Sequence, residues 1–519
     1  MAIADALPLL FSTFLSALGG IVYELLIGGI SSYLLGNSVY QFSITIGLFM
    51  SSMGLGSYLS RFVRGGLVGR FIYVEAWLGL VGGFSALALF AAYAYTDFYD
   101  LVMYLLIVAI GTLIGLEIPL LTRIIEDRHR NLRVTLANVL SFDYIGSLIG
   151  AVAFPLLFLP RVGLIRTAFL MGLVNLAVVA LILIRYRREI QDEAAGSVKA
   201  GPGEEKAGLK GRARLYLATG LVLLIVMALS AGFAQSYDLG RYLEQHLYRD
   251  RVVYVEQSPY QKIVLTRNGD DLRLFLDGNL QFSSRDEYRY HEALVHPAMS
   301  LAPNHDEVLL LGAGDGLAAR EILKYPDVGR ITLVDLDARV VELARKNPAI
   351  RKLNLGALDD RKVRVVIQDA YKFLEQNSDL FAAIIIDLPD PNNESLNKLY
   401  TAQFYELAGR HLVPGGVMVT QSTSPYFAPQ PFWSIVKTVK SAGLSAVGYH
   451  VNVPSFGDWG FTLASNRRLR LDKLHVIAPT RFLDDQGLRA AFTFGKDEVA
   501  RGRGVQANTL TGDSQPYLV

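Results

Sequence analysis

Five aspartates in the C-terminal half of the chain stand directly after predicted strands or in the turns that follow them. They are Asp315, Asp335, Asp369, Asp387 and Asp390. Ligands of open α/β sheets bind at the carboxyl ends of the strands, so we expect these carboxylates to line one site. A site with so much negative charge suits a cationic ligand.

The loop around Asp315 reads Leu-Gly-Ala-Gly-Asp-Gly over 311–316 and differs from the phosphate-binding G-x-G-x-x-G motif. An acid in such a loop would repel a pyrophosphate, so the loop favours a cationic ligand without phosphate. Asp335 stands where a carboxylate accepts hydrogen bonds from ribose hydroxyls. Asp369, followed by Ala370, stands where an acid can accept a hydrogen bond from an adenine amino group. Together these features predict an S-adenosyl ligand.

Asp387 and Asp390 distinguish two kinds of enzyme that use S-adenosyl ligands. A methyltransferase that acts on a neutral group does not need this pair of carboxylates, whereas an enzyme that holds an alkylamine and deprotonates its nitrogen does. An alkylammonium has a pKa near 10.4, so forming the neutral amine at pH 7 costs about 4.6 kcal/mol. A carboxylate that fixes the amine and accepts its proton supplies part of this free energy.

The segments that position these aspartates have the pattern of an α/β enzyme. Residues 250–284 contain two or three short alternating runs, typical of antiparallel strands, with a tight hairpin turn at Asn268-Gly269. A helix follows, and then strands alternate with helices, which predicts a doubly wound parallel sheet. We therefore expect a small β-sheet subdomain followed by a Rossmann-like α/β domain over 285–519.

The N-terminal half of the chain is far more apolar than the C-terminal half. Charged residues make up 19% of the whole chain, against about 25% in soluble proteins. A helix that crosses the hydrocarbon core of a membrane needs about 20 mainly apolar residues. The stretches that qualify are 6–35, 38–62, 71–96, 99–122, 134–159, 162–184 and 214–234. We expect residues 1–235 to form an all-α transmembrane bundle of seven spans, with a flexible polar loop over 185–213.

Three acids, Glu24, Glu117 and Asp143, lie inside predicted spans. Intramembrane carboxylates are costly, and they either mark functional sites or pair with polar groups of neighbouring helices. A role in conducting a substrate and a purely structural role both stay open for these three side chains.

Composition excludes several classes of function. The chain has no cysteine, so disulfides, thiolate metal sites and a cysteine nucleophile are absent. A net charge of +2 gives no indication of nucleic-acid binding.

Lysine and arginine in the short loops indicate that the N-terminus and the even-numbered loops are cytoplasmic, which with seven spans places the C-terminal domain outside.

The motifs of the C-terminal half resemble those of the polyamine aminopropyltransferases, typified by spermidine synthase. The resemblance covers about residues 252–465, and bacterial members of the family include forms with a fused multi-span N-terminal region. The matching motifs are Tyr260-Gln261, Leu276-Asp277-Gly278 with Gln281, Asp286-Glu287-Tyr290-His291-Glu292, Gly312–Gly316, Val334-Asp335-Leu336-Asp337, Gln368-Asp369-Ala370 and Asp387-Leu388-Pro389-Asp390-Pro391.

This resemblance implies transfer of an aminopropyl group from decarboxylated S-adenosylmethionine to an amine, putrescine by default, which yields spermidine and methylthioadenosine. It implies that Asp387 is the catalytic base, that no further cofactor or metal is used, and that the protein is a homodimer or larger assembly. The donor-binding residues it implies are Gln261, Asp315, Asp335, Asp369 and Ala370. The acceptor-binding residues it implies are Tyr290, His291, Asp315 and Asp390.

The segment after Asp387 departs from the family pattern. Leu388-Pro389 replaces small hydroxyl residues, and Asn392-Asn393 stands where the family usually has Gly-Pro. These differences concern the acceptor more than the donor. A longer amine or an amine-bearing lipid headgroup is therefore an alternative to putrescine.

Two other functions stay open at this point. A methyltransferase would share the Rossmann-like core but would leave the Asp387–Asp390 pair and Tyr290-His291 unexplained. A polyamine transporter or sensor with a non-catalytic binding domain would account for the intramembrane acids. We expect a multi-pass protein of the cell membrane. The charged donor is made in the cytosol, so we expect the catalytic domain to face the cytoplasm. This orientation conflicts with the seven-span count, which places the domain outside.

Overall fold

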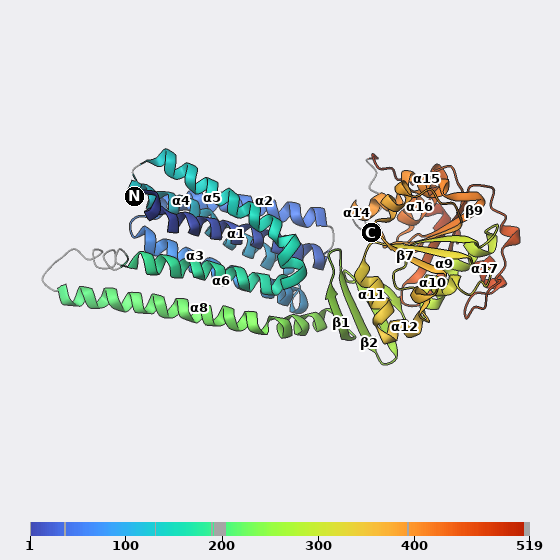
Figure 1. The fold of residues 1–519 in the computed structure, drawn as a ribbon, viewed down its shortest axis with the longest axis horizontal. Helices are drawn as coiled ribbons and strands as arrows, with labels where there is room; N and C mark the ends of the chain where they lie inside the picture. The colour runs from blue at the N-terminus through green and yellow to red at the C-terminus, as the bar shows by residue number, and fades with distance from the viewer. Residues whose placement is uncertain are drawn as a thin grey trace. The chain divides into compact units, whose positions relative to one another are not determined.

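The computed structural model describes residues 2–35, 38–129, 131–187, 190, 204–391 and 394–512. The chain forms two compact units, Met1–Arg249 and Asp250–Val519. The first unit is helical and the second contains the β-strands (Figure 1).

In the described part of the first unit, seven helices are long and apolar enough to cross a membrane. They are α1 (Ala2–Leu35), α2 (Ser38–Leu59), α3 (Leu67–Tyr95), α4 (Tyr99–His129), α5 (Leu132–Ala153), α6 (Leu164–Arg185) and α8 (Glu204–Leu247). Shorter segments are the 3-10 helix η1 (Ser60–Phe62) and the π-helix η2 (Phe154–Val162). Each long helix overlaps one of the predicted stretches, and the helices lie side by side within this unit (Figure 1).

Part of the predicted polar loop is helical. Helix α8 begins at Glu204, so residues 204–213 are helical, while residues 188–189 and 191–203 of the predicted loop lie outside the described residues. Eight of the ten residues over 204–213 are glutamate, lysine, alanine, leucine or arginine, which have high helix propensity even without an apolar run.

Helices α2 and α4 pack backbone to backbone through two glycines. A Cβ added to Gly56 of α2 would lie 2.1 Å from the carbonyl oxygen of Thr112, and one added to Gly115 of α4 would lie 2.1 Å from that of Met53. Real Cβ atoms do not approach backbone this closely, so any larger residue would force the helices apart. Small residues at helix contacts permit this close packing in membrane bundles.

We expect Gly56→Val to destabilise the helical unit, because the added carbons must displace the backbone of α4. Overpacking of this kind costs about 1–3 kcal/mol. Gly54→Val is the matched control, since it lies in the same helix and a Cβ there meets no atom within 4 Å. Thermal unfolding of the detergent-solubilised protein, monitored by size-exclusion chromatography after heating, should show a lower midpoint temperature for Gly56→Val only. Equal midpoints for the two variants would contradict this packing.

Within residues 250–391 and 394–512, the first sheet has four antiparallel strands in the order β1-β2-β3-β4. They are β1 (Arg251–Gln257), β2 (Lys262–Asn268), β3 (Asp271–Leu276) and β4 (Asn279–Ser283). The prediction of two or three strands missed one of them. The β2–β3 turn lies at Gly269-Asp270, one residue later than predicted, because Asn268 pairs with Asp271. The β3–β4 turn is at Asp277-Gly278, where both residues have positive φ (47° and 79°).

The second sheet of the same described segments has seven strands in the order β10-β11-β9-β8-β5-β6-β7. They are β5 (Glu307–Gly312), β6 (Arg330–Asp335), β7 (Val363–Ile367), β8 (Phe381–Asp387), β9 (Leu412–Gln421), β10 (Ser445–Val453) and β11 (Gly457–Ser465). Strands β5 to β9 are parallel, as predicted for a Rossmann-like domain. The expectation of a wholly parallel sheet is wrong for β10 and β11, which pair antiparallel because only three residues join them.

Helices cover this sheet and connect its strands. The longer ones are α9 (Glu287–Leu301), α10 (Leu317–Ile322), α11 (Ala338–Lys346), α12 (Pro348–Leu353), α13 (Ala370–Gln376), α15 (Ala402–Arg410) and α16 (Pro429–Ser441). The shorter or C-terminal ones are η3 (Ala357–Asp359), α14 (Glu394–Asn397), η4 (Lys398–Tyr400), η5 (Leu471–Lys473), α17 (Asp485–Ala490) and α18 (Lys496–Arg501).

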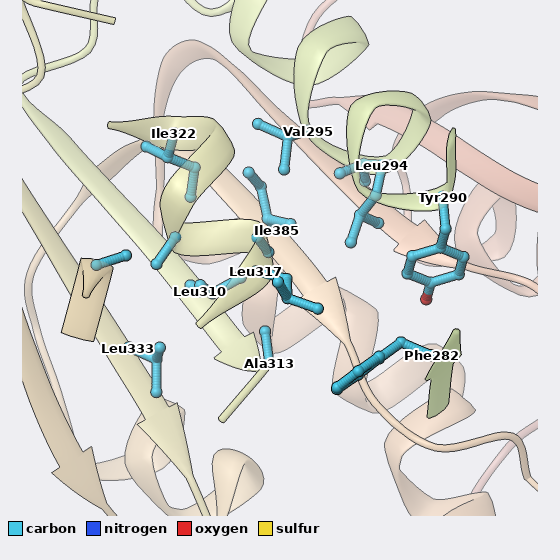
Figure 2. Close-up of a cluster of buried hydrophobic side chains, with 14 of the residues drawn as sticks. Phe282, Tyr290, Leu294, Val295, Leu310, Ala313, Leu317, Ile322, Leu333 and Ile385 are labelled. Carbon is cyan, nitrogen blue, oxygen red and sulfur yellow. The ribbon is translucent and has the colours of Figure 1, made fainter. Parts of the chain in front are cut away.

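Helix α9 is fixed by the apolar core beneath it. Leu294 and Val295 of α9 are fully buried and belong to the same cluster as Leu310 of β5 and Ile385 of β8. Figure 2 shows these side chains converging between the helix and the strands. Because Tyr290 lies one helical turn before Leu294, this packing also determines where the Tyr290 ring lies.

Candidate active site

The site lies at the carboxyl ends of β5 and β8, which are neighbours in the sheet. The chain leaves these two strands in opposite directions, toward β6 and toward β9, and ligands of doubly wound sheets bind at such a switch point. Gly312 pairs with Asp387 at this edge. Its φ is +82°, and a Cβ there would lie 2.0 Å from the Asp387 carbonyl oxygen, so the position requires glycine.

Asp387 meets Tyr290 at the switch point. The Tyr290 hydroxyl donates a hydrogen bond of 2.6 Å to Oδ1 of Asp387. Figure 2 shows Tyr290 at the edge of the apolar cluster. The rings around Tyr290 are those of His291, Phe456, Trp459 and Phe461. The structure therefore brings the predicted base and a predicted acceptor residue together beside an aromatic wall.

A buried row of charges fixes His291 beside these residues. Nδ1 of His291 lies 3.0 Å from Oε2 of Glu287, and Arg320 forms two hydrogen bonds of 2.8 and 2.9 Å with the same carboxylate. Burial would lower the pKa of His291, but the hydrogen bond and charge of Glu287 raise it to about 9. His291 is therefore a cation at neutral pH, and its charge acts on the nearby carboxyls of Asp315 and Asp387.

Burial changes the proton affinity of both these aspartates. Loss of hydration raises the pKa of Asp387 to about 6, with His291 and the Tyr290 hydroxyl opposing the rise and the charge of Asp315 adding to it. Burial also raises the pKa of Asp315, against the attraction of His291. A carboxylate with a pKa of about 6 is a better proton acceptor near neutral pH than an ordinary aspartate.

Asp390 is held by the end of β9. Nε2 of Gln421 donates to Oδ1 of Asp390 at 3.0 Å and to the Leu388 carbonyl at 2.8 Å. Burial raises the pKa of Asp390 to about 6, against hydrogen bonds from Gln421 and Thr423. Sequence reasoning missed both of these partners, although the polar run over 420–424 directly after an apolar strand was a usable signal.

Tyr400 anchors the segment in which the sequence departs from the family pattern. Its buried hydroxyl lies 3.0 Å from the Leu388 carbonyl oxygen and 3.1 Å from that of Pro389. The two asparagines that also depart from the pattern, Asn392 and Asn393, lie outside the described residues. The Tyr400 hydroxyl therefore holds the backbone of the turn between Asp387 and Asp390.

Asp335 ends β6 in direct contact with the glycine loop. Its carboxylate accepts hydrogen bonds from the backbone N–H groups of Gly314 at 2.9 Å and Asp337 at 2.8 Å. A Cβ at Gly314 would lie 2.6 Å from Oδ2 of Asp335, so the glycine permits this contact. Burial raises the pKa of Asp335 to about 6.

Gln261 and Asp369 have protein partners in the structure. Nε2 of Gln261 donates to Oδ2 of Asp337 at 3.0 Å, which brings the β1–β2 turn to the end of β6. Asp369 caps helix α13 and pairs with Lys398 at 2.7 Å. Ala370 is the buried first residue of α13. These residues lie at the carboxyl ends of β6 and β7, on the far side of β5 from Asp387.

The site can hold a cation and move a proton. The buried carboxyl of Asp315 and the partly buried carboxyls of Asp387 and Asp390 offer negative charge, while the rings around Tyr290 can contact the apolar part of a ligand. In the described part of the chain, no group of three or more His, Cys, Asp or Glu side chains is arranged to hold a metal ion.

Comparisons with known proteins identify the family. Residues 287–473 match the family described as the spermine/spermidine synthase domain. A polyamine aminopropyltransferase of Oceanobacillus iheyensis is 43% identical over 454 residues, which cover 86% of this chain and 83% of the relative. One of Mycobacterium tuberculosis is 42% identical over 475 residues, with coverage of 86% and 83%. A crystal structure of spermidine synthase in complex with the transition-state analogue AdoDATO is 27% identical, with a TM-score of 0.46, and the match covers 48% of this chain and 88% of that chain. The chain belongs to the polyamine aminopropyltransferases.

Proposed function

We propose that the second unit transfers the aminopropyl group of decarboxylated S-adenosylmethionine to an amino group of putrescine, with Asp387 as the base. The observation that carries this proposal is the partly buried Asp387 carboxyl, held 2.6 Å from the Tyr290 hydroxyl at the switch point of the sheet. Membership of the aminopropyltransferases favours aminopropyl transfer over the methyl transfer that the glycine loop alone would allow.

The reaction needs a neutral amine and a leaving thioether. The putrescine nitrogen gives a proton to Asp387, and its lone pair forms a bond to the aminopropyl carbon beside the sulfonium. The carbon–sulfur bond breaks, and its electron pair neutralises the sulfur, so methylthioadenosine leaves and spermidine forms. No charge accumulates on an oxygen atom, and the positioning of the two substrates supplies much of the rate.

The donor lies, in this proposal, along the ends of β5, β6 and β7. Asp315 binds the ammonium of the aminopropyl group, because a buried carboxylate favours a cation beside it in addition to the nearby charges of His291 and Arg320. Asp335 binds the ribose hydroxyls, and Asp369 with Ala370 binds the adenine. Gln261 contacts the methylthioadenosine part from the β1–β2 turn.

The acceptor lies between Asp390, Asp387 and the Tyr290 ring. Asp390 binds one ammonium of putrescine, and the other nitrogen faces Asp387. His291 acts as a positioning residue and does not touch the amine, because the His291 cation and the ammonium of putrescine repel each other. Its charge keeps part of the Asp387 population ionised. This proposal gives His291 an indirect role, while its prediction as an acceptor-binding residue stays a prediction.

We also propose that the first unit spans the cell membrane, that the catalytic unit faces the cytoplasm, and that the protein is a homodimer. The seven apolar helices support the first part, and the cytosolic origin of the donor supports the second. The parity of seven spans argues against the cytoplasmic orientation.

Asp387→Asn should lower kcat by about 10²- to 10⁴-fold, because the amide can still accept the Tyr290 hydrogen bond but cannot take a proton. Release of methylthioadenosine by the purified full-length protein, given decarboxylated S-adenosylmethionine and putrescine, measures this loss. Asp390→Asn is the comparison, and it should raise KM for putrescine more than it lowers kcat. Wild-type kcat in Asp387→Asn would exclude Asp387 as the base, whereas no turnover by wild type with any amine would exclude the whole proposal.

The activity should fall as the pH drops through the pKa of Asp387, since the base works only in its ionised form, which predominates above about pH 6. Tyr290→Phe removes a hydrogen bond that lowers this pKa, so the acid limb of the kcat/KM profile should move up by about one pH unit. Tyr449→Phe is the control, because the Tyr449 hydroxyl is also buried but donates to the Ala293 carbonyl. An acid limb that stays in place in Tyr290→Phe would contradict this assignment.

Reporter fusions at the C-terminus test the orientation. A green fluorescent protein fused after the last residue should fluoresce in cells, and an alkaline phosphatase fused there should be inactive, because the catalytic unit faces the cytoplasm. The opposite pair of results would place the catalytic unit outside, as the seven-span parity predicts.

A further inference from the structure

A polar cluster lies inside the helical unit and has no part in the aminopropyl transfer. Ser16 of α1 donates a hydrogen bond of 2.5 Å to Glu75 of α3, and the Glu75 carboxyl lies close to that of Glu117 of α4. Glu75 is fully buried and Glu117 is 4% exposed. Sequence analysis singled out Glu117 but not Glu75, so the pairing of these two carboxyls comes from the structure.

The pair is buried without a balancing cation among the described residues. Two ionised carboxylates side by side repel each other, and burial disfavours even a single charge on the pair. Without a cation beside them both carboxyls therefore favour their protonated form, whereas a cation between them would allow one to ionise. Neither carboxyl forms an ion pair with an arginine or lysine among the described residues. Buried charges in proteins are normally paired.

Two further side chains point polar atoms into the same region without a partner. The Tyr23 hydroxyl of α1 and both amide atoms of Asn175 of α6 are fully buried and have no hydrogen-bond partner among the described residues. The charges of Glu75 and Glu117 both act on the Tyr23 hydroxyl, so it lies close to the pair. Oε2 of Glu75 and Oε1 of Glu117 also have no partner.

Glycines bring these side chains together along one face of α3. Glu75, Gly79 and Gly82 lie on that face at helical spacing. A Cβ at Gly82 would lie 2.3 Å from the hydroxyl-bearing ring carbon of Tyr23, and one at Gly79 would lie 3.4 Å from Cβ of Asn175. Four helices thus direct oxygen atoms into one enclosed part of the bundle.

We propose that Glu75 and Glu117, with Tyr23 and Asn175, form a binding site for an alkylammonium group within the helical unit. An ammonium group donates three hydrogen bonds and carries one positive charge. The donors match the acceptor oxygens that lack partners, and the positive charge would allow one carboxyl of the pair to ionise. Its hydrocarbon chain would pack against the apolar helix faces around the cluster.

An alkylammonium fits these residues better than a metal ion does. The described residues contain no group of three or more His, Cys, Asp or Glu arranged to hold a metal ion. A diamine or triamine is a ligand of this chemical class, and the choice of polyamine as the occupant rests on the proposed function of the second unit. The site itself rests only on the contacts within the first unit.

Binding of radiolabelled putrescine to the full-length protein in lipid nanodiscs, measured by equilibrium dialysis without the donor, tests the proposal. Wild type should show two independent classes of site. Glu75→Gln/Glu117→Gln should lose one class, or bind it about 10- to 100-fold more weakly, because a hydrogen bond to a charged group contributes about 1.5–3 kcal/mol. Asp387→Asn/Asp390→Asn should lose only the other class, so failures of the two proposals are distinguishable.

Two further variants keep the test decisive. Tyr23→Phe removes only the hydroxyl and leaves the ring on Gly82, so it should weaken the same class of site without unfolding the bundle. Glu24→Gln, the control, removes a neighbouring acid on α1 on which no charge of the cluster acts, and it should leave both classes unchanged. A single class of site in wild type, unaffected by Glu75→Gln/Glu117→Gln and by Tyr23→Phe, would overturn the proposal and leave the pair as a site for a proton only.

Discussion

Negative charge buried at the switch point is the constraint on which the catalytic unit depends. Removing a carboxylate from water costs several kcal/mol unless a partner compensates it. His291, whose pKa is about 9, supplies that partner for Asp315 and Asp387. Glu287 in turn holds His291, and Arg320 holds Glu287 through two hydrogen bonds. The site can therefore keep its acids ionised in part although burial disfavours their charge.

Helix α9 positions the side chains that meet this electrostatic requirement. It carries both Tyr290 and His291, and its apolar side packs on the sheet beneath. The far side of the helix is fixed as well, because the buried Glu292 carboxylate accepts hydrogen bonds from three successive backbone N–H groups, those of Arg481, Phe482 and Leu483. A helix held on two sides presents its functional residues with little freedom. This rigidity suits a reaction whose rate depends on positioning.

Sequence reasoning could place the parallel strands and their terminal acids, because apolar runs and their polar ends have clear local patterns. It could not place partners that are distant along the chain. Gln421 binds Asp390 only because β9 lies beside β8, and Glu75 meets Glu117 only because α3 packs on α4. The antiparallel hairpin of β10 and β11 was missed for a different reason, since strand direction depends on the short connection rather than on the strands themselves. The helical start of α8 shows that polar composition alone does not indicate a loop.

The central claim is that the Asp387 carboxylate contacts the nitrogen that attacks the donor. A structure of the full-length protein with methylthioadenosine and putrescine bound would test it directly, through the distance between the Asp387 carboxylate oxygens and the nearer putrescine nitrogen. We predict a distance of about 2.6–3.2 Å, within hydrogen-bond reach, with the other nitrogen at Asp390. A nearer nitrogen held by another residue and out of reach of Asp387 would contradict the account.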